Sequence, residues 1–235
     1  MSVVILNILC EGQTEERFVG KVLKPYLKDK GIVVKSRLLV TSRKKNAQGG
    51  ILSYAQVIRD LQTWMKEAKD NSHEKNFFTT MFDWYRLPND FPAWDEAKRQ
   101  SDCYNSIERL EAAFGQNVNK ENFVPYIQLH EFEALVFCGL DSLKEAYPGC
   151  DKEIEGLKKV LADNGNNPEK INNSLETAPS KRLKKALSKR YNYDKIKSGT
   201  EITEETGIDA LRKSCPHFNE WLGKIERLSV SINQK

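Results

Sequence analysis

Short apolar runs alternate with longer segments of helical periodicity along the first part of the chain. Residues 3–9 are almost continuously apolar and rich in β-branched side chains, which predicts a strand buried on both faces, as in a parallel sheet. After a turn at Gly12, apolar residues recur at helical spacing, with Thr14 as a candidate N-cap and Gly31 as the residue that ends the helix. The chain therefore begins with a strand, a tight turn and a helix.

The same alternation continues to about residue 129. Further strands are predicted at 31–41, 77–82 and 123–129, and further helices at 51–69 and 94–114. Strands that alternate with helices of this length are typical of an α/β fold with a mostly parallel sheet flanked by helices. From about Leu140 the pattern changes to helical segments, at 141–162 and 179–190. We therefore expect an α/β core over 1–139 and a helical C-terminal region over 140–235 that packs on the core.

Carboxylates follow three of the predicted strands at the point where each strand ends. Glu11 follows the first strand and Asp83 the third, while His130, Glu131 and Glu133 follow the fourth. The carboxyl ends of parallel strands meet at one edge of a sheet, where ligands bind in such folds. Acids gathered there repel each other unless protons or a cation neutralise them, and Mg²⁺ and Mn²⁺ prefer oxygen ligands. The sequence therefore predicts a divalent-metal site at this edge.

A metal ion at this edge would polarise a phosphoryl oxygen and activate water, with Glu11 or Glu131 as the proton acceptor. Each carboxylate taken alone is also explained as a helix cap or a solvated charge. Glu15 and Glu16 need no ligand, because acids in a first helical turn complement the helix dipole. The zinc-protease motif H-E-x-x-H is incomplete, since Ala134 stands where the second histidine belongs.

Positive charge is concentrated in two segments, although the chain as a whole carries only +4 (37 Lys and Arg against 33 Asp and Glu). The segment 179–197 carries eight basic residues and one acid, or +7, and the segment 35–45 carries five basic residues without an acid. Basic segments beside a metal-binding edge suit a phosphodiester backbone, and a solvated helix face is the alternative. The candidate nucleic-acid-binding residues are Lys181, Arg182, Lys184, Lys185 and Arg190.

Other classes of protein are poorly supported. The five cysteines are odd in number and lack C-x-x-C spacing, so we expect neither a disulfide framework nor a thiolate zinc site. The first residues do not look like a signal peptide, and no apolar run approaches the roughly 18 residues of a membrane span. We therefore expect a cytoplasmic protein. The P-loop pattern and the nucleophile elbow of serine hydrolases are both missing.

Several long motifs resemble one known family. They read C-E-G-x-T-E-E-x-F-V at 10–19, T-M-F-D-W-Y-R-L-P-N-D-F-P at 80–92, P-Y-I-Q-L-H-E-F-E-A-L at 125–135, A-P-S-K-R-L at 178–183 and C-P-H-F-N-E-W-L at 215–222. Across nearly the whole chain they resemble the bacterial domain-of-unknown-function family 4276, which is regarded as Toprim-like and related to the nuclease half of the overcoming-lysogenization-defect proteins. The resemblance implies a magnesium-dependent nuclease fold, often encoded beside an ATPase partner, with phage defence as a plausible context.

The resemblance also assigns residues. Glu11 matches the acid after the first Toprim strand, and Asp83 matches the first acid of the Asp-x-Asp element after the third strand. Tyr85 stands where the second acid belongs, so Asp90, Glu131 or Glu133 would have to replace that acid. We therefore expect cleavage with a single metal ion.

Two hypotheses of different kinds follow. The first is a Mg²⁺- or Mn²⁺-dependent nuclease that cleaves DNA or RNA, with Glu11, Asp83 and Glu131 as catalytic residues, these three and Glu133 as metal ligands, and an ATPase as partner. The second, favoured by Tyr85, is a non-catalytic Toprim-like partner that regulates an ATPase. Phosphatase or nucleotide hydrolysis at the same edge is a further possibility.

Overall fold

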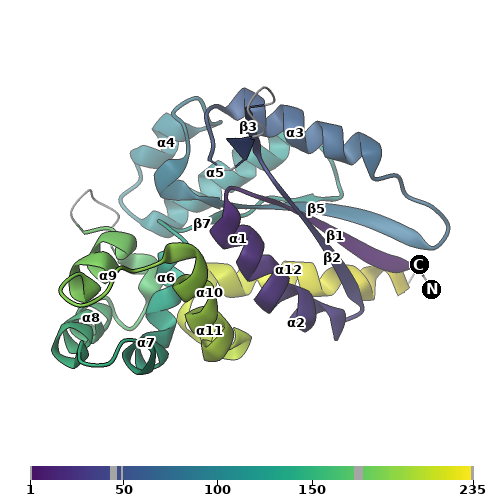
Figure 1. The fold of residues 1–235 in the computed structure, drawn as a ribbon. Coiled ribbons are helices and arrows are strands. Elements are labelled where there is room, and N and C mark those ends of the chain that lie inside the picture. The colour runs from purple at the N-terminus through teal and green to yellow at the C-terminus, as the bar shows by residue number, and fades with distance from the viewer. Residues whose placement is uncertain (1, 43–46, 49, 172–176, 234–235) are drawn as a thin grey trace.

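A parallel sheet forms the centre of the computed structural model, which describes residues 2–42, 47–48, 50–171 and 177–233. Its strands are β1 (Val3–Cys10), β2 (Ile32–Leu38), β5 (Glu74–Asp83), β6 (Phe123–Val124) and β7 (Ile127–Gln128). The order is β2-β1-β5-β6, with β7 beside the end of β5, and every pair in it is parallel (Figure 1). A small antiparallel pair, β3 (Val40–Ser42) and β4 (Ala47–Gln48), lies apart from it.

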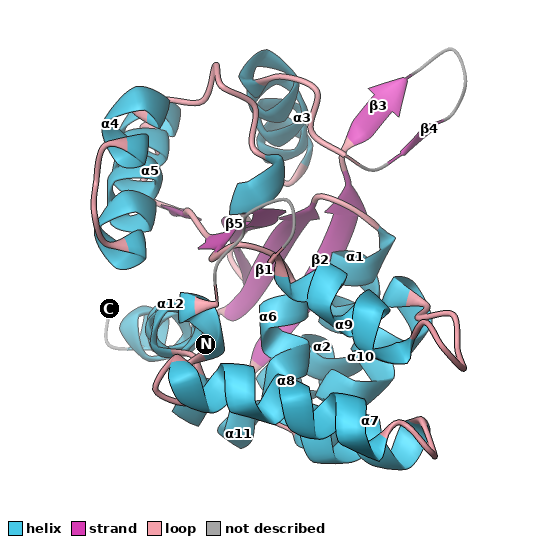
Figure 2. Cartoon of the chain, turned by 90° about the vertical axis from the view of Figure 1, so that its left-hand side faces the viewer, coloured by secondary structure: helices cyan, strands magenta, loops and turns pink. Residues whose placement is uncertain are grey.

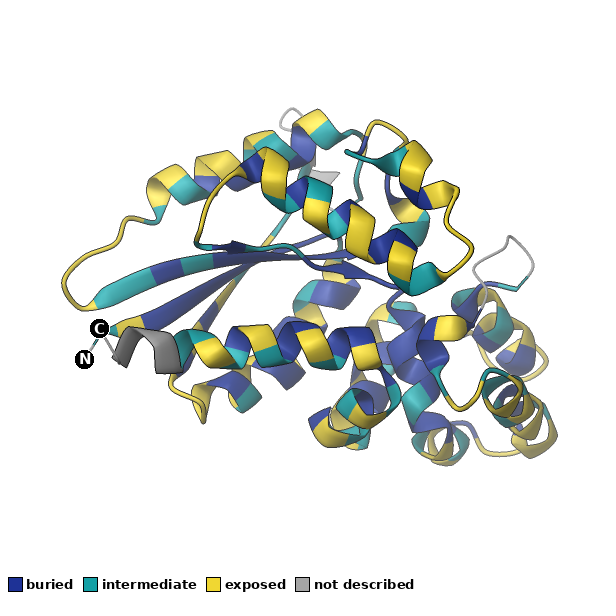
Figure 3. Ribbon diagram, turned by 180° about the vertical axis from the view of Figure 1, so that it is seen from behind, coloured by how far each residue is buried: buried dark blue, intermediate teal, exposed yellow. Residues whose placement is uncertain are grey.

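Strand β1 is the central strand, and its apolar residues reach both faces of the sheet. Val4, Leu6 and Ile8 belong to one buried apolar cluster, whereas Leu9 belongs to a second cluster on the opposite face. Figure 3 shows β1 in dark blue for most of its length. The prediction of a strand buried on both faces is confirmed, because helices cover the sheet on each side.

The helices that connect the strands lie on opposite faces. One face is covered by α3 (Tyr54–Glu67), α4 (Trp94–Lys98) and α5 (Cys103–Val118), and the other by α1 (Gln13–Phe18), a π-helical segment (Val19–Leu23), α2 (Lys24–Lys28) and α12 (Pro216–Asn233) (Figure 1). Indole Nε1 of Trp221 donates a hydrogen bond to Oγ1 of Thr79 at 3.0 Å, and the Trp221 ring stacks on Tyr126 at 4.4 Å. These contacts hold α12 against the sheet.

The remaining helices lie beside the carboxyl ends of the strands. They are α6 (Glu133–Val136), α7 (Leu140–Ala146), α8 (Asp151–Asp163), α9 (Pro179–Leu187), α10 (Lys195–Thr206) and α11 (Ile208–Ser214). Short 3₁₀ segments lie at Trp84–Arg86, Phe137–Gly139 and Pro168–Lys170. The predicted α/β class, with a mostly parallel sheet flanked by helices and a helical C-terminal region, is confirmed. The division at residue 139 stays a prediction, and one buried apolar cluster includes residues from both sides of it.

The predicted elements are interrupted where polar or special residues intervene. The helix predicted at 94–114 is two helices, because the Asp102 side chain caps α5 by accepting hydrogen bonds from the Tyr104 and Asn105 amides. The helix predicted at 141–162 is broken before Asp151, where Gly149 has a φ of +80°. The fourth strand is split at Pro125, which has no N–H for the sheet. At α1 the N-cap is Gly12 rather than Thr14.

The connections of the sheet diverge at the ends of β1 and β5. The chain leaves β1 toward β2 through α1 and α2, and it leaves β5 toward β6 in the other direction, through α4 and α5. Neighbouring strands whose connections diverge in this way form the ligand-binding crevice of open α/β sheets. In Figure 2 the carboxyl ends of these strands face the viewer, between α4 and α5 on one side and α6, α9 and α10 on the other.

No helix within the described ranges is long and apolar enough to cross a membrane.

A buried carboxylate joins the C-terminal region to the core. Glu169 is fully buried, and its Oε1 accepts a hydrogen bond from the Phe218 amide at 2.9 Å. Its Oε2 accepts from the His217 amide at 2.9 Å and from the Tyr104 hydroxyl at 3.0 Å. One side chain therefore satisfies the amino-terminal turn of α12 and a residue of α5.

We expect Glu169→Ala to lower the free energy of unfolding by about 3 kcal/mol, because it leaves buried donors without an acceptor. Urea unfolding followed by circular dichroism measures the change. Glu204→Ala, at an exposed position of α10, is the matched control and is expected to change the free energy by less than about 0.5 kcal/mol. Equal effects of the two substitutions would contradict the role assigned to Glu169.

Candidate functional site

Glu11 and Asp83 meet at the ends of β1 and β5. The Asp83 amide donates a hydrogen bond to Oε2 of Glu11 at 2.9 Å, and the Glu11 amide donates to the Met81 carbonyl at 3.1 Å. Both side chains are buried, at 7% exposure for Glu11 and 3% for Asp83. The structure therefore brings together the two acids that the sequence places after adjacent parallel strands. Their role as metal ligands stays a prediction.

Helix α6 contributes a third carboxylate, and α10 contributes an ammonium group. Glu133 is fully buried in the first turn of α6. Nζ of Lys195, the first residue of α10, lies 3.1 Å from Oε2 of Glu133 and 3.6 Å from Oδ2 of Asp83. The other Asp83 oxygen, Oδ1, accepts a hydrogen bond from the Phe132 amide at 2.8 Å. Lys195 therefore bridges an acid at the end of β5 and an acid on α6.

Glu15 is the fourth buried acid at this edge, at 4% exposure in the first turn of α1. Its carboxylate lies back over Gly12, where an added Cβ would stand 3.1 Å from Oε2 of Glu15. The pKa of Glu15 is raised to about 7, mainly by burial, with contributions from the negative charges of Glu11 and Glu133. The helix dipole alone does not explain an acid that other acids perturb. We call Glu11, Glu15, Asp83, Glu133 and Lys195 the acidic cluster.

Burial and mutual repulsion set the charge state of the acidic cluster. Burial, with the negative charge of Asp83 as a second cause, raises the pKa of Glu11 to about 8. Burial also raises the pKa of Asp83 and of Glu133. Burial would lower the pKa of Lys195, but Asp83 and Glu133 raise it. Four buried carboxylates and one ammonium thus share this edge, and burial together with mutual repulsion favours the protonated form of each acid.

The donor set of the cluster suits a divalent cation. Its acids offer carboxylate oxygens, and Oε1 of Glu133 is buried without a hydrogen-bond partner within the described part of the chain. In that same part, no three His, Cys, Asp or Glu side chains are already arranged as a set of metal ligands. The ammonium of Lys195 lies between Asp83 and Glu133 and occupies the space that a metal ion shared by these two acids would take. A metal ion would therefore have to displace protons and Lys195.

Glu131 is close to the cluster but is directed to another helix. Its Oε2 accepts a hydrogen bond from the Ser180 amide at 2.9 Å, and its Oε1 accepts from the Ser180 hydroxyl at 3.1 Å. Glu131 therefore caps the amino terminus of α9. Its negative charge is near enough to contribute to the raised pKa of Asp83. Its predicted roles as catalyst and ligand stay predictions.

Two other residues singled out in the sequence have structural partners. His130 has a φ of +64° and its ring stacks on Trp84 with a centroid distance of 5.8 Å. Burial lowers its pKa to about 4, so His130 is neutral at pH 7. The Asp90 carboxylate accepts hydrogen bonds from the Tyr54 amide at the start of α3, at 2.9 and 3.0 Å. Asp90 therefore stabilises α3 rather than replacing the acid missing at position 85.

The predicted nucleic-acid-binding residues lie on and just after α9. Lys181, Lys184, Lys185 and Arg190 are exposed, whereas Arg182 is partly buried and its Nε donates a hydrogen bond to the Thr177 carbonyl at 2.7 Å. A pocket of about 390 Å³ lies at the end of the helix, lined by Lys184, Lys189, Arg190 and neighbouring residues. A basic surface thus begins beside Glu131, next to the acidic cluster.

Other basic residues in the two segments behave differently. Lys195 belongs to the acidic cluster, and Arg37 pairs with Glu67 and lies over the Trp64 ring. Arg43, Lys44 and Lys45 lie outside the described residues.

The comparison with protein families agrees with the motifs. The family model described as Domain of unknown function (DUF4276) matches residues 10–226. Among solved structures, the C-terminal region of the OLD protein of Xanthomonas campestris pv. campestris aligns with 90% of this chain and 95% of its own, at 18% sequence identity and a TM-score of 0.26. No curated protein matches the chain.

The raised pKa values predict a stability that depends on pH and on metal. A carboxylate whose pKa is higher in the folded than in the unfolded protein stabilises the fold fully below its unfolded pKa, and this stabilisation is lost as the pH rises through the folded pKa. For Glu11 that window runs from 4.5 to about 8. We therefore expect the Tm of the metal-free protein to fall as the pH rises from about 5 to 9, and Mg²⁺ to restore about 5 °C or more at the upper end.

Differential scanning fluorimetry in EDTA and in Mg²⁺ measures this dependence. Glu11→Gln keeps an acceptor for the Asp83 amide and removes the titrating group, so it should flatten the pH dependence and weaken the response to Mg²⁺. Glu204→Gln, on the exposed side of α10, should behave like the wild type. A wild-type Tm that neither falls with rising pH nor responds to Mg²⁺ would contradict the prediction that the site binds a cation.

Proposed function

We propose that this chain, which belongs to the DUF4276 family, is a Mg²⁺- or Mn²⁺-dependent nuclease that cleaves phosphodiester bonds of DNA or RNA. The observation that carries the proposal is the acidic cluster, in which four buried acids, one just after β1 and the others on α1, β5 and α6, lie around one ammonium group that pairs with two of them. Buried like charges are unfavourable for folding unless they are neutralised. A divalent cation and an anionic substrate are the natural ligands of such a cluster beside a basic surface.

Each member of the cluster has a role in the proposed reaction. The oxygen ligands would come from Asp83, Glu133, Glu15 and Glu11. A bound Mg²⁺ or Mn²⁺ would polarise a phosphoryl oxygen and lower the pKa of water. Glu11 or Glu131, at the same edge, would accept the proton of the attacking water. Lys195 is placed to contact a phosphoryl oxygen and to offset the negative charge that develops there.

Helix α9 extends the site toward the substrate backbone. Its first turn is fixed beside the cluster by the hydrogen bonds from Ser180 to Glu131, and Lys181, Lys184 and Lys185 are exposed along it. Lysine and arginine side chains bind phosphates without regard to base sequence. Backbone contacts by α9 would therefore place a substrate across the acidic cluster.

A second candidate function is a non-catalytic partner of an ATPase. Two observations favour it: Tyr85 replaces an acid, and Lys195 already neutralises part of the charge of Asp83 and Glu133. In this function the ion pair is permanent and the cluster binds no metal. An ATPase partner and a role in phage defence belong to both candidates as proposals.

We expect Asp83→Asn to reduce Mg²⁺-dependent cleavage by about 100-fold or more, because it removes a metal-binding charge. Asparagine keeps an oxygen acceptor for the Phe132 amide, so the fold should persist. Cleavage of plasmid DNA and of RNA is measured with Mg²⁺ or Mn²⁺, with and without an ATPase encoded beside the gene. Isothermal calorimetry provides the second readout: an enzyme binds the metal ion, and Asp83→Asn loses it.

The non-catalytic candidate predicts the opposite pattern. Wild-type protein would bind no divalent ion and cut no nucleic acid under any of these conditions, and Asp83→Asn would bind the ATPase as tightly as the wild type. That set of results would overturn the nuclease proposal.

The basic surface predicts a salt-dependent affinity. Lys184→Ala combined with Lys185→Ala should weaken DNA binding uniformly across sequences and reduce the slope of log affinity against log salt by about 2. Fluorescence anisotropy over a range of salt concentrations measures the slope. The double variant Lys28→Ala with Lys213→Ala removes two exposed lysines of α2 and α11 and is expected to leave the slope unchanged. Equal slopes for both double variants would exclude α9 from the interface.

A further inference from the structure

A groove lined with aromatic side chains begins directly after Asp83. The 3₁₀ segment Trp84–Arg86 contributes Trp84 and Tyr85 to one wall, and α4 contributes Trp94 and Lys98 to the other. The groove has a volume of about 410 Å³. The first residue of the groove, Trp84, therefore directly follows an acid of the cluster in the sequence.

The aromatic rings of the groove are partly exposed and held in place. Trp84 stacks on His130 at 5.8 Å with 18° between the ring planes, and the Tyr85 amide donates a hydrogen bond to the His130 carbonyl at 2.9 Å. Nζ of Lys98 lies 4.6 Å from the Trp94 ring centroid. In contrast, Trp64 and Trp221 are only 3% and 2% exposed. Fixed, accessible rings are the surfaces on which nucleobases stack.

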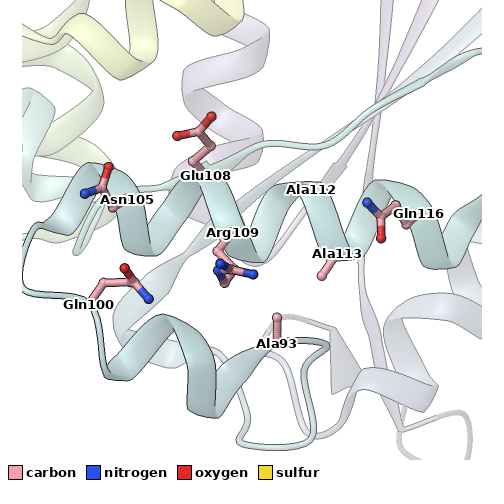
Figure 4. Close-up of a pocket in the computed structure, with 8 residues that line it drawn as sticks. All are labelled: Ala93, Gln100, Asn105, Glu108, Arg109, Ala112, Ala113 and Gln116. Atoms are coloured by element: carbon pink, nitrogen blue, oxygen red, sulfur yellow. The ribbon is translucent and has the colours of Figure 1, made fainter.

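A second groove of polar character continues from the first. It lies between α5 and the loops at the two ends of α4 and has a volume of about 360 Å³. Gln100 lines both grooves, which makes them neighbours along one surface. Figure 4 shows Arg109 directed toward the space between α4 and α5, with Asn105 near Gln100 at the start of α5 and Gln116 toward its other end. Glu108 also lines this groove. The guanidinium of Arg109 offsets its charge, and the guanidinium and amide groups suit phosphates and base edges.

We propose that these two grooves bind an unpaired stretch of the nucleic-acid substrate, with bases on Trp84, Tyr85 and Trp94 and the backbone at Lys98 and Arg109. The proposal rests on the proposed function and adds a substrate class, single-stranded or locally unwound DNA or RNA. Bases in a duplex already stack on their neighbours, so their faces are not available to protein rings. Aromatic grooves also take proline-rich peptides, but the direct link to Asp83 favours the substrate.

The test measures tryptophan fluorescence in EDTA, where no metal-dependent cleavage occurs. Full-length wild-type protein is titrated with an unpaired oligothymidine, an unstructured RNA, a blunt DNA hairpin and a polyproline peptide. We expect the two single strands to quench the fluorescence and to bind more tightly than the hairpin, since only Trp84 and Trp94 are accessible among the four tryptophans. Quenching by the peptide alone, or equal affinity for the hairpin, would overturn the proposal.

Variants assign the binding to the groove. Trp94→Leu and Tyr85→Leu should each weaken single-strand affinity by about fivefold or more. Trp94→Phe keeps an aromatic face, so its single-strand affinity should stay within about threefold of the wild type. Lys213→Ala, on α11, should have the affinity of the wild type. Thermal melts establish that each variant is folded. If Trp94→Leu does not fold, the affinities of Tyr85→Leu and Trp94→Phe test whether the groove binds the single strand. Wild-type affinity in a folded Tyr85→Leu variant would overturn the proposal.

The groove proposal and the nuclease proposal can be refuted independently of each other. Single-strand binding that requires Trp94 and Tyr85, without cleavage of any substrate in Mg²⁺ or Mn²⁺, would retain the groove and refute the nuclease. Cleavage that proceeds with unchanged single-strand affinity in both leucine variants would retain the nuclease and refute the groove.

Discussion

The repulsion among buried carboxylates is the constraint on which this structure turns. Glu11 and Asp83 are brought within hydrogen-bonding distance by two adjacent parallel strands, and Glu15 and Glu133 are added by the helices α1 and α6. At neutral pH this group holds more negative charge than Lys195 can offset, so it must keep protons or bind a cation. Protonation depends on pH, whereas the proposed binding of a cation would depend on both pH and metal concentration, so the two can be distinguished.

The fold makes this cluster depend on both ends of the chain. The acids come from residues before 139, whereas Lys195 comes from α10, which packs against α1. Helix α12 covers the face of the sheet that also carries α1 and α2, and Glu169 connects the first turn of α12 to α5. The C-terminal helices therefore contribute to the site itself, since they supply the positive charge of the acidic cluster, Lys195, and the basic helix α9 next to it.

The sequence predicted the sheet and the meeting of Glu11 with Asp83, because a run of buried β-branched residues and an acid at its end are both local signals. It did not separate buried acids from exposed ones. Glu15 follows the same rule as any acid in a first helical turn, and only its burial against Gly12 identifies it as part of the cluster. Lys195 was one of eight basic residues in a segment, and its place between Asp83 and Glu133 depends on how α10 packs. Glu131 caps α9, a partner 49 residues away in sequence.

The identity of residue 85 connects the two halves of the argument. In the Asp-x-Asp element that the Toprim-like resemblance implies, this position would hold a second acid beside Asp83. Here the chain turns into a 3₁₀ segment immediately after Asp83, and Tyr85 lines the aromatic groove instead. Relative to that element, one carboxylate is missing beside Asp83, and one aromatic ring lies on the adjacent surface. The two proposals therefore meet at residue 85: with one acid fewer, the proposed nuclease would hold a single metal ion, and the added ring would contact the proposed unpaired strand.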